Sequence, residues 1–442
     1  MRYDVVVVGA RVAGAATAML LARAGLRVLA LDRVTFPSDT VSSHQVQVPG
    51  VALLRRWGLL DRLVAAGTPA TRRVRFDPGP VVLEGAYPAH GGVDAVYSPR
   101  RTLLDAALVA AAREAGAEVI EGVRVTELTH DASGRVDGLR GTRRGGAALH
   151  AAAGLVIGAD GKHSTVARLV GARAYRTRAV RAFACYGYHA GVPLAGGEIY
   201  QRPGMAAAAF PTDDDLTMVY LSAPLDGFDR FRRDIEGSYL DMLDRCGDLG
   251  GRVRAGVRVE RLRTTPDQPN TFRAASGPGW ALVGDAGVVM DSITGQGIGH
   301  ALRDADGLAA AVAAGLGGGR PLAAALAEHG RRRDREIAAR YDFTVGLAEF
   351  RPPTAVQRLL FTSLRDRPAE ITRFLGALAG VTPIDAYLSV RNAARVIATY
   401  YPTRSRTSPS TRLRMSSRMT RTVPRSWPAG SATCQSSWRW PG

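Results

Sequence analysis

Three short segments of the chain combine glycine with an acidic side chain in spacings that suit nucleotide binding. The first runs from Gly9 to Gly14 and is followed by Asp32. Glycines at the first and sixth positions allow a tight turn and close helix packing, which brings backbone N–H groups and a helix dipole to a pyrophosphate. An acid about 20 residues further on accepts a hydrogen bond from a ribose hydroxyl group. The segment predicts a dinucleotide site in which Arg11, at a position that is usually glycine, turns its side chain away or pairs with phosphate.

The other two segments place an acid beside glycine at the end of an apolar run. Asp160 and Gly161 follow one such run, and Ser164 is a suitable N-cap for the residues after it. Gly284 and Asp285 follow another run and precede a second glycine-rich turn, residues 295–297, which should open a helix. Each segment alone is an ordinary turn at a strand end, but all three in this order are uncommon.

Hydrophobic periodicity indicates the elements that position these segments. Short apolar runs rich in β-branched residues are typical of buried parallel strands, whereas residues 101–115 have the leucine and alanine spacing of a helix. Strands alternating with helices imply an α/β fold with a doubly wound parallel sheet. The four expected strands are residues 4–8, 26–31, 154–158 and 280–283.

The middle and the end of the chain have different patterns. Residues 173–272 contain short runs, turn residues and an expected hairpin at 212–215, which predict an inserted antiparallel sheet. Residues 322–350 and 355–397 have mostly helical patterns. Residues 399–442 are rich in Ser, Thr, Arg and Pro without periodicity, so we expect a disordered basic tail.

Composition excludes several classes of protein. No apolar run reaches the roughly 20 residues of a membrane span, and the apolar start lacks the basic region of a secretion signal, so we expect a cytoplasmic protein. Three cysteines without close spacing argue against a disulfide framework or a cysteine-based metal site, and no metal is expected. The net charge is +18, of which the eight arginines of residues 401–442 supply +8, and the other ten charges are scattered. Only Lys162 among the 58 basic residues is lysine, so no nucleic-acid partner is expected.

Together the three segments resemble the class A flavoprotein monooxygenases, which share the para-hydroxybenzoate hydroxylase fold, and the related geranylgeranyl-reductase-like FAD oxidoreductases. The resemblance covers roughly residues 3–345. It implies a glutathione-reductase-like FAD-binding domain, in which the Asp160–Gly161 segment contacts both FAD and a transient NAD(P)H reductant. The cofactor-binding residues that it implies are Gly9, Ala13, Gly14, Asp32, Arg33, Arg101, Val125, Asp160, Gly161, Gly284, Asp285, Gly295, Gln296, Gly297 and Ile298.

The resemblance also implies a division of the chain. The FAD-binding domain is expected to be discontinuous and the antiparallel sheet to carry the substrate, followed by C-terminal helices. The expected boundaries are 1–75, 98–172 and 273–345 for FAD, 76–97 and 173–272 for substrate, 346–398 for the helical segment and 399–442 for the tail.

Two departures from the family pattern concern the segment after Gly284. The family commonly has Asp-Ala-Ala-His-x-x-Pro-Pro here, whereas residues 285–292 keep the length but lack the histidine and both prolines. Thr294 also replaces a glycine. Since one of those prolines usually lies beside the flavin and the substrate, the family gives little guidance on substrate geometry here.

The activity implied by the resemblance is FAD-dependent monooxygenation. NAD(P)H and O2 would serve to hydroxylate or epoxidise a small aromatic, indole or polyene substrate through a C4a-hydroperoxyflavin, in bacterial secondary metabolism such as antibiotic biosynthesis. The catalytic residues are not identified, with His44 and His189 as candidate proton relays, and Ala206–Ala209 would leave room above a ring. Candidate substrate-pocket residues are Tyr186, Tyr188, Tyr200, Met205, Phe210 and Met218.

Four other functions remain as alternatives. A reductase of isoprenoid double bonds shares the fold and the motifs. A flavin-dependent halogenase is disfavoured because its Trp-x-Trp-x-Ile-Pro segment is missing, and a flavin carrier because the Asp160–Gly161 segment is retained. A basic nucleic-acid-binding protein is the remaining alternative. A separate flavin reductase as electron donor, and a monomeric or homodimeric state, both stay open.

Overall fold

The structure is a computed structural model that describes residues 2–42 and 44–400. The predicted disordered tail lies outside the described residues, except for residues 399 and 400, which end the last helix. Among the described residues, no helix has both the length and the apolar character needed to cross a membrane.

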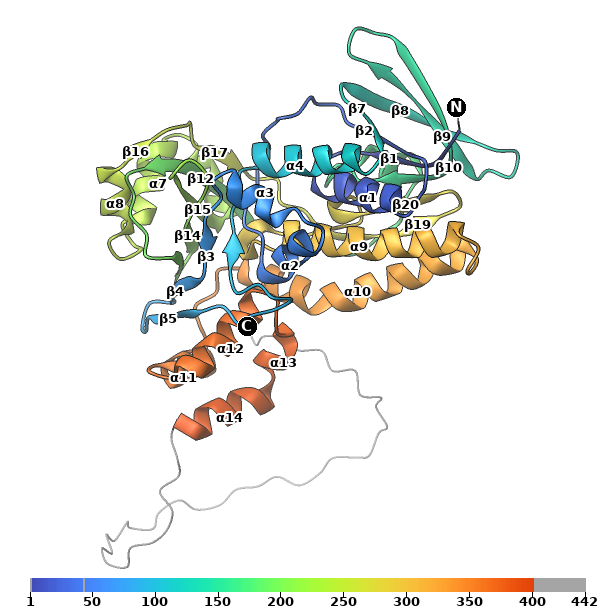
Figure 1. Ribbon diagram of the computed structural model, residues 1–442. Helices are drawn as coiled ribbons and strands as arrows, with labels where there is room; N and C mark the ends of the chain where they lie inside the picture. The colour runs from blue at the N-terminus through green and yellow to red at the C-terminus, as the bar shows by residue number, and fades with distance from the viewer. Residues whose placement is uncertain (1, 43, 401–442) are drawn as a thin grey trace, which may run out of the picture. The chain divides into compact units, whose positions relative to one another are not determined.

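A sheet whose central strands are parallel, as predicted, forms the first layer of the fold (Figure 1). Its strand order is β19-β20-β10-β1-β2-β7, and β8 and β9 extend it beside β10 as an antiparallel ribbon. The valines of β1 are buried because both of its faces are covered. The strands are β1 (Arg2–Val8), β2 (Val28–Leu31), β7 (Glu118–Ile120), β8 (Val123–His130), β9 (Val136–Arg143), β10 (Ala148–Gly158), β19 (Ser276–Gly277) and β20 (Trp280–Leu282).

One predicted strand is longer than its apolar run. The sequence predicts residues 154–158, whereas β10 begins at Ala148, since residues 148–152 pair antiparallel with β9. In this outer half, exposed and buried residues alternate, so no continuous apolar run marks it. Only the half that pairs with β1 and β20 on both sides has the pattern of a buried parallel strand.

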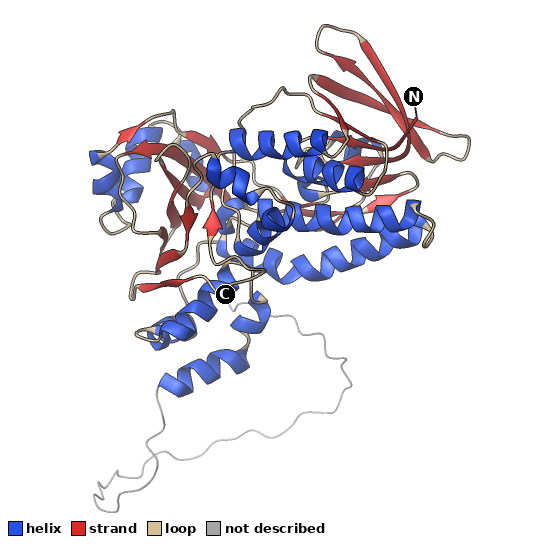
Figure 2. Cartoon of the chain, viewed as in Figure 1, coloured by secondary structure: helices blue, strands red, loops and turns tan. Residues whose placement is uncertain are grey.

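The two faces of this sheet are covered differently (Figures 1 and 2). Helices pack on one face, and the β8–β9 ribbon with the short helix α5 (Thr165–Leu169) packs on the other. The α1 helix starts within the first glycine-rich segment, at Val12, and α9 starts at Gly297, the last residue of the second. The helices on the first face are α1 (Val12–Arg23), α2 (Val48–Arg56), α3 (Leu60–Ala65), α4 (Arg101–Glu114), α9 (Gly297–Leu316) and α10 (Leu322–Leu347).

The second layer is a mostly antiparallel sheet built from two separate stretches of the chain. Its order is β16-β12-β15-β14-β13-β4-β5, with β17 beside β12. The predicted hairpin turn at 212–215 joins β14 to β15, and Asp214 and Asp215 both have positive φ. The strands are β4 (Arg73–Asp77), β5 (Leu83–Ala86), β12 (Ala182–Ala190), β13 (Gly197–Arg202), β14 (Met205–Pro211), β15 (Thr217–Pro224), β16 (Val257–Arg258) and β17 (Arg263–Thr265).

Helices and smaller sheets complete the described part of the chain. On the outer face of the antiparallel sheet lie α6 (Phe228–Phe231), α7 (Ile235–Leu243) and α8 (Leu249–Ala255). A three-stranded sheet joins β11 (Ala174–Arg178), β18 (Asn270–Arg273) and β21 (Val288–Val289), and β3 (Ala70–Thr71) pairs with β6 (Val96–Tyr97). The C-terminal helices are α11 (Ala355–Leu364), α12 (Pro368–Leu378), α13 (Ile384–Leu388) and α14 (Val390–Tyr400).

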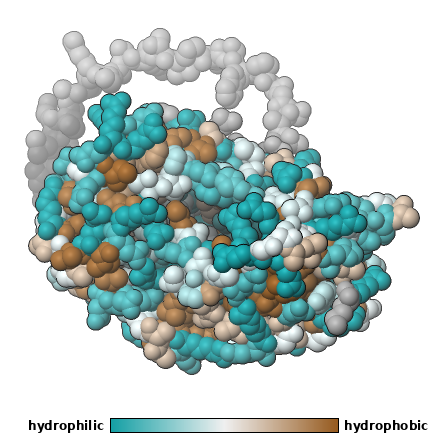
Figure 3. Space-filling model, turned by 90° about the horizontal axis from the view of Figure 1, so that it is seen from above, coloured by the Kyte–Doolittle hydropathy of each residue, from teal (hydrophilic) through white to brown (hydrophobic). Residues whose placement is uncertain are grey.

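The surface seen in Figure 3 is mostly hydrophilic. Hydrophobic residues lie there in small separate groups.

Candidate active site

The first glycine-rich turn requires glycine at both predicted positions. Gly9 has φ +95°, and a Cβ there would lie 2.5 Å from the carbonyl oxygen of Ala159. A Cβ on Gly14 would lie 1.7 Å from the carbonyl oxygen of Gly9. Asp32 accepts hydrogen bonds from the N–H groups of Ala10 (2.7 Å) and Val34 (3.0 Å) and so fixes the turn against the end of β2. The turn thus has the tight bend and close helix packing that a bound pyrophosphate needs.

Arg11 points away from this turn. Its guanidinium pairs with the fully buried carboxylate of Asp105 and donates to the carbonyl oxygens of Ser38 (3.0 Å) and Asp39 (3.2 Å). Arg101, one turn before Asp105 on α4, donates to the same carboxylate at 2.9 Å. The sequence left open whether Arg11 would pair with phosphate, and it did not identify Asp105. Two cations, Arg11 and Arg101, therefore share this one carboxylate beside the turn.

The second motif organises its own helix. The Asp160 carboxylate accepts hydrogen bonds from the N–H groups of Thr165 (2.6 Å) and Val166 (3.2 Å) and from the hydroxyl of Ser164. Ser164 accepts the N–H of Ala167 at 3.0 Å, which confirms the predicted N-cap. Burial raises the pKa of Asp160. All these contacts hold the start of α5, so the Asp160 carboxylate shapes the turn around Gly161.

Arg273, which no motif identified, joins the second and third motifs. Its guanidinium donates to the carbonyl oxygens of Lys162 (2.8 Å) and Ala286 (3.0 Å), which follow the second and third acidic positions. Its own N–H donates to the carbonyl oxygen of Gly287 at 2.7 Å. Arg273 lies at the end of β18, far in sequence from the second motif and a short loop before the third, so its role depends on the tertiary structure.

The third motif presents a carboxylate without a protein partner. In the described part of the chain, no group donates a hydrogen bond to the carboxylate of Asp285, which is partly exposed. Burial raises the pKa of Asp285, and Arg101, Lys162 and Arg273 oppose this by their charge. Gly284 has φ +61° and donates its N–H to Asp304 of α9 at 2.8 Å. Asp304 in turn pairs with His329 of α10 at 3.1 Å, so two helices hold the turn that presents Asp285.

The glycine-rich turn before α9 leaves its backbone open. Gly295 has φ +60°, and a Cβ on Gly297 would meet no atom within 4 Å. The buried side chain of Gln296 points to the C-terminal helices and donates to the carbonyl oxygen of Leu378 at 3.0 Å. Ile298 is buried in the main core. The open N-terminus of α9 is suited to a partial negative charge.

The remaining predicted cofactor residues differ in accessibility. Arg33 is exposed at the end of β2, and Val125 is buried in β8. Ala13 lies in the first turn of α1, and a Cβ added to Gly284 would lie 2.7 Å from the Cβ of Ala13. The first and third motifs are therefore in direct contact. Open backbone turns, a partner-free carboxylate and a cationic neighbourhood together fit a bound dinucleotide such as FAD.

A cavity of about 110 Å³ lies between the antiparallel sheet, the residues that follow the third motif, and the C-terminal helices. Its wall is mostly apolar and includes Ala206–Ala208, the small residues that the sequence predicted to leave room. The lining residues are Gln45, Gln47, Phe76, Tyr87, Ile199, Ala206, Ala207, Ala208, Phe210, Tyr220, Ser292, Ile293, Thr294, Gly295, Phe343, Leu347, Leu375, Leu378 and Ala379.

The predicted pocket residues divide between the two faces of the sheet. Phe210 lines the cavity, and Tyr186, Tyr188 and Met218 pack with it on the same face. Tyr200 and Met205 do not reach the cavity, which corrects their predicted placement. Successive side chains of a strand point to opposite faces, so both pack against α7 and α8 instead.

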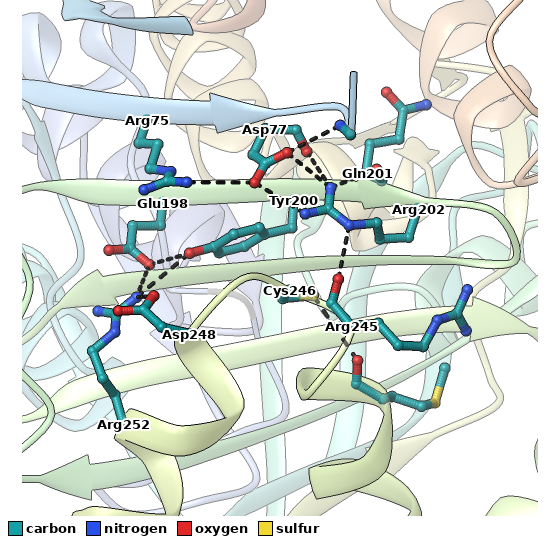
Figure 4. Close-up of polar contacts among 12 residues, drawn as sticks. Arg75, Asp77, Glu198, Tyr200, Gln201, Arg202, Arg245, Cys246, Asp248 and Arg252 are labelled. Atoms are coloured by element: carbon teal, nitrogen blue, oxygen red, sulfur yellow. Dashed lines mark hydrogen bonds and ion pairs between the residues drawn. The ribbon is translucent and has the colours of Figure 1, made fainter. Parts of the chain in front are cut away.

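Figure 4 shows what Tyr200 does on that outer face. Its hydroxyl donates to Glu198 at 2.6 Å, and Arg252 of α8 pairs with the same carboxylate at 2.7 Å. Arg202 pairs with Asp77 nearby at 2.9 Å. These contacts fasten the outer helix to β13 and β4, so Tyr200 has a structural role.

The two candidate histidines are also separated. His44 is fully buried, bonds through Nε2 to the hydroxyl of Tyr188, and has Nδ1 2.7 Å from the carbonyl oxygen of Ser42. Burial and the neighbouring charge of Arg101 lower the pKa of His44 to about 3. His189 lies on the outer face, 3.3 Å from the hydroxyl of Tyr239, and burial lowers its pKa to about 4. Only His44 therefore lies on the cavity side of the sheet.

Asp291 is a buried acid that sequence reasoning missed. It is 1% exposed, and its Oδ1 accepts the N–H of Ile293 at 2.9 Å, next to the residues that line the cavity. Its Oδ2 has no hydrogen-bond partner in the described part of the chain. Burial raises the pKa of Asp291 to about 7.

Replacing Asp291 by asparagine is expected to remove a pH-dependent loss of stability. Between about pH 4 and pH 7 the folded state keeps a proton that the unfolded state has released, so the wild type loses stability as the pH rises. The difference between the free energies of unfolding of the wild type and the variant should change by up to about 4 kcal/mol over this pH range. Urea unfolding of the wild type and the variant from pH 4 to pH 8 measures this difference. The histidines with lowered pKa values contribute equally to both proteins and therefore drop out of the comparison. Parallel stability curves would show that Asp291 ionises normally.

Known proteins resemble the chain along most of its length. It is 29% identical over 342 residues to the menaquinone reductase of Mycolicibacterium smegmatis, covering 68% of this chain and 74% of that protein. It is 26% identical over 360 residues to a ubiquinone hydroxylase of Rhodospirillum rubrum, and the match covers 75% of this chain and 78% of that protein. The solved structure of a myxobacterial FAD-dependent chondrochloren halogenase has a TM-score of 0.72 at 22% identity, covering 90% and 96%, which shows a common fold.

The family model described as FAD binding domain matches residues 2–341. This range contains all three motifs and both sheets. The fold class and the family resemblance predicted from the sequence are therefore confirmed. The chain belongs to the FAD binding domain family of class A flavoproteins and is an FAD-dependent oxidoreductase.

Proposed function

We propose that the protein is a monooxygenase that uses NAD(P)H and O2 to hydroxylate or epoxidise a small aromatic, indole or polyene substrate. One observation carries the proposal: the cavity is apolar, and part of its wall is Ser292–Gly295, the link between the third motif and α9. A substrate bound there lies next to the residues assigned to FAD. A site poor in water suits oxygen transfer because water and free protons divert the oxygen to peroxide.

The residues of the chain have distinct tasks in this proposal. The backbone around Gly9 and Gly14 holds the pyrophosphate. The carboxylate of Asp285, which has no protein donor, accepts a hydrogen bond from a hydroxyl group of the cofactor. The open N-terminus of α9 stabilises negative charge on the bound group. FAD, when bound, supplies the redox chemistry by accepting hydride and activating O2. The predicted division into a discontinuous FAD-binding part and a substrate-binding sheet belongs to the same proposal and is supported by the two separate sheets.

The identity of the electron donor and of the oxidant can be tested on the purified holoenzyme. Under anaerobic conditions, NADPH or NADH is expected to bleach the flavin absorbance, and admission of air should restore it with consumption of O2. Turnover under ¹⁸O2 should place one labelled atom in the product. Bleaching without labelled product would contradict monooxygenation, and absence of bleaching by either nucleotide would indicate a separate flavin reductase.

A second function is favoured by a specific observation. The relative from Mycolicibacterium smegmatis is a menaquinone reductase, and the sequence also resembles the isoprenoid reductases. For this alternative, a double bond of an isoprenoid chain would enter the apolar cavity and be reduced. The same holoenzyme would then turn over without O2 and transfer hydrogen to the product. Product formation under strict anaerobiosis separates the two functions.

A further inference from the structure

We propose that the cavity binds a neutral molecule that donates a hydrogen bond to the phenolic oxygen of Tyr220. The inference rests on the proposed function only in taking this cavity as the substrate site. It adds the chemical class of the ligand and the residue that selects it.

The charge of the ligand follows from the wall of the cavity. None of the lining residues identified in the described part of the chain carries a formal charge. A carboxylate or an ammonium group placed there would lose its hydration without gaining an opposite charge, which is costly. Two ionisable groups of opposite sign flank this wall: Arg340, whose guanidinium donates to the carbonyl oxygen of Leu378 at 3.3 Å, and Asp291, whose charge acts on Tyr220. Together they favour neither an anionic nor a cationic ligand. The cavity is therefore suited to a neutral ligand.

The hydrogen-bond direction at Tyr220 is set by residues behind it. The backbone N–H of Ser292 can only donate, and it donates to Oε1 of Gln268 at 3.2 Å. The Nε2 of Gln268 donates to the carbonyl oxygen of Ala182 at 3.3 Å, which fixes the amide in the same orientation. The hydroxyl of Ser292, which bonds to the same Oε1, must therefore use its only proton there.

This order leaves Tyr220 as an acceptor toward the cavity. The oxygen atoms of Tyr220 and Ser292 are 2.8 Å apart, and the proton of Ser292 is already committed, so Tyr220 donates to Ser292. Burial raises the pKa of Tyr220, which keeps this proton in place. Ser222, the other hydroxyl beside Tyr220, donates its own proton to the carbonyl oxygen of Phe183 at 3.0 Å. The phenolic oxygen therefore has a free lone pair and no proton to offer, so a ligand hydroxyl or N–H group is its complement.

Two other polar groups of the wall are already paired, whereas the hydroxyl of Tyr87 has no hydrogen-bond partner in the described part of the chain, so Tyr220→Phe is the variant that separates Tyr220 from Tyr87. The hydroxyl of Thr294 lies 2.8 Å from that of Thr344, and Nε2 of Gln47 donates to Oε1 of Gln45 at 2.6 Å. These paired groups therefore accept a hydrogen bond from a ligand less readily than the oxygen of Tyr220 does. A ligand with only acceptors, such as an ether, would leave that oxygen without a partner.

Three matched probes test the inference on the holoenzyme without reductant: 4-propylphenol, its methyl ether 4-propylanisole, and 4-propylbenzoate. Binding is followed by perturbation of the flavin spectrum and by ligand-detected NMR. The phenol should bind about tenfold more tightly than the ether, and the benzoate more weakly than the phenol by at least about tenfold. Tyr220→Phe should remove the preference for the phenol over the ether.

Two further variants make the test specific. Tyr200→Phe removes a buried phenol on the other face of the same sheet and should leave all three affinities unchanged. Ser292→Ala frees the Tyr220 proton to point into the cavity, where it can be donated to the ether or to the phenol, so it should weaken the preference for the phenol. Equal binding of phenol and ether to the wild type, tight binding of the benzoate, or no binding of any probe would overturn the inference. These titrations need neither NAD(P)H nor O2, so their outcome is independent of whether the protein is an oxygenase.

Discussion

Asp285→Ala is expected to yield protein that purifies without its yellow cofactor. The Asp285 carboxylate has no protein donor in the described part of the chain, although the Gly284 turn is held rigidly by Asp304. A carboxylate that accepts a ligand hydroxyl contributes about 1.5–3 kcal/mol, so the dissociation constant of FAD should rise roughly 10- to 150-fold. FAD absorbance per protein after gel filtration, and titration of apoprotein with FAD, measure the change.

The matched control is Asp306→Ala. Asp306 lies on α9, partly exposed, and pairs with Arg56 on the surface. Its loss removes one negative charge, as Asp285→Ala does, but away from the three motifs. Stoichiometric FAD in Asp285→Ala, or equal loss of FAD in both variants, would mean that Asp285 does not hold the cofactor.

Gly14→Ala is expected to destabilise the fold severely. The added Cβ would lie 1.7 Å from the carbonyl oxygen of Gly9, a backbone atom that cannot move without opening the turn. Alanine gains up to about 1 kcal/mol of helix propensity over glycine, whereas overpacking costs about 1–3 kcal/mol or more. Contact at this distance with a fixed backbone atom places the cost at the upper end. The steric term therefore dominates, and the net loss should be at least about 2 kcal/mol.

Urea unfolding of the apoprotein measures this loss without the contribution of bound FAD. Gly251→Ala in α8 is the control, because a Cβ there would meet no atom within 4 Å and the residue is exposed. This variant should be neutral or slightly stabilised. A Gly14→Ala protein as stable as Gly251→Ala would show that the turn can open, and the close-packing role of Gly14 would be wrong.

The parts of the fold that could be predicted from the sequence are those that depend on local sequence patterns. The strands β1, β2 and β20 coincide closely with their apolar runs because each is buried on both faces. The glycine positions were equally clear, since the positive φ of Gly9 and the contact at Gly14 admit no other residue without strain. Ser164 was recognisable as a cap because N-capping depends on the next three residues alone.

The site was less predictable where it depends on contacts between distant segments. Arg273 joins two turns, Asp304 holds Gly284, and Leu378 reaches the cavity from the C-terminal helices. Each of these residues has an ordinary local sequence, and its role depends on what folds against it. Asp105 had a weak signal, its position four residues after Arg101, but the pairing with Arg11 did not follow from it.

By itself, the sequence determined the FAD-binding fold and the positions of its three motifs, because close backbone packing around a dinucleotide restricts residue type at fixed spacings. Only the tertiary structure decided which side of the antiparallel sheet faces the cavity. Alternation along a strand has a period of two, but its phase depends on which layer packs on each face. For that reason Tyr200 and Met205 lie on the outer face, whereas Tyr220, whose local sequence looks no different, lies in the cavity wall.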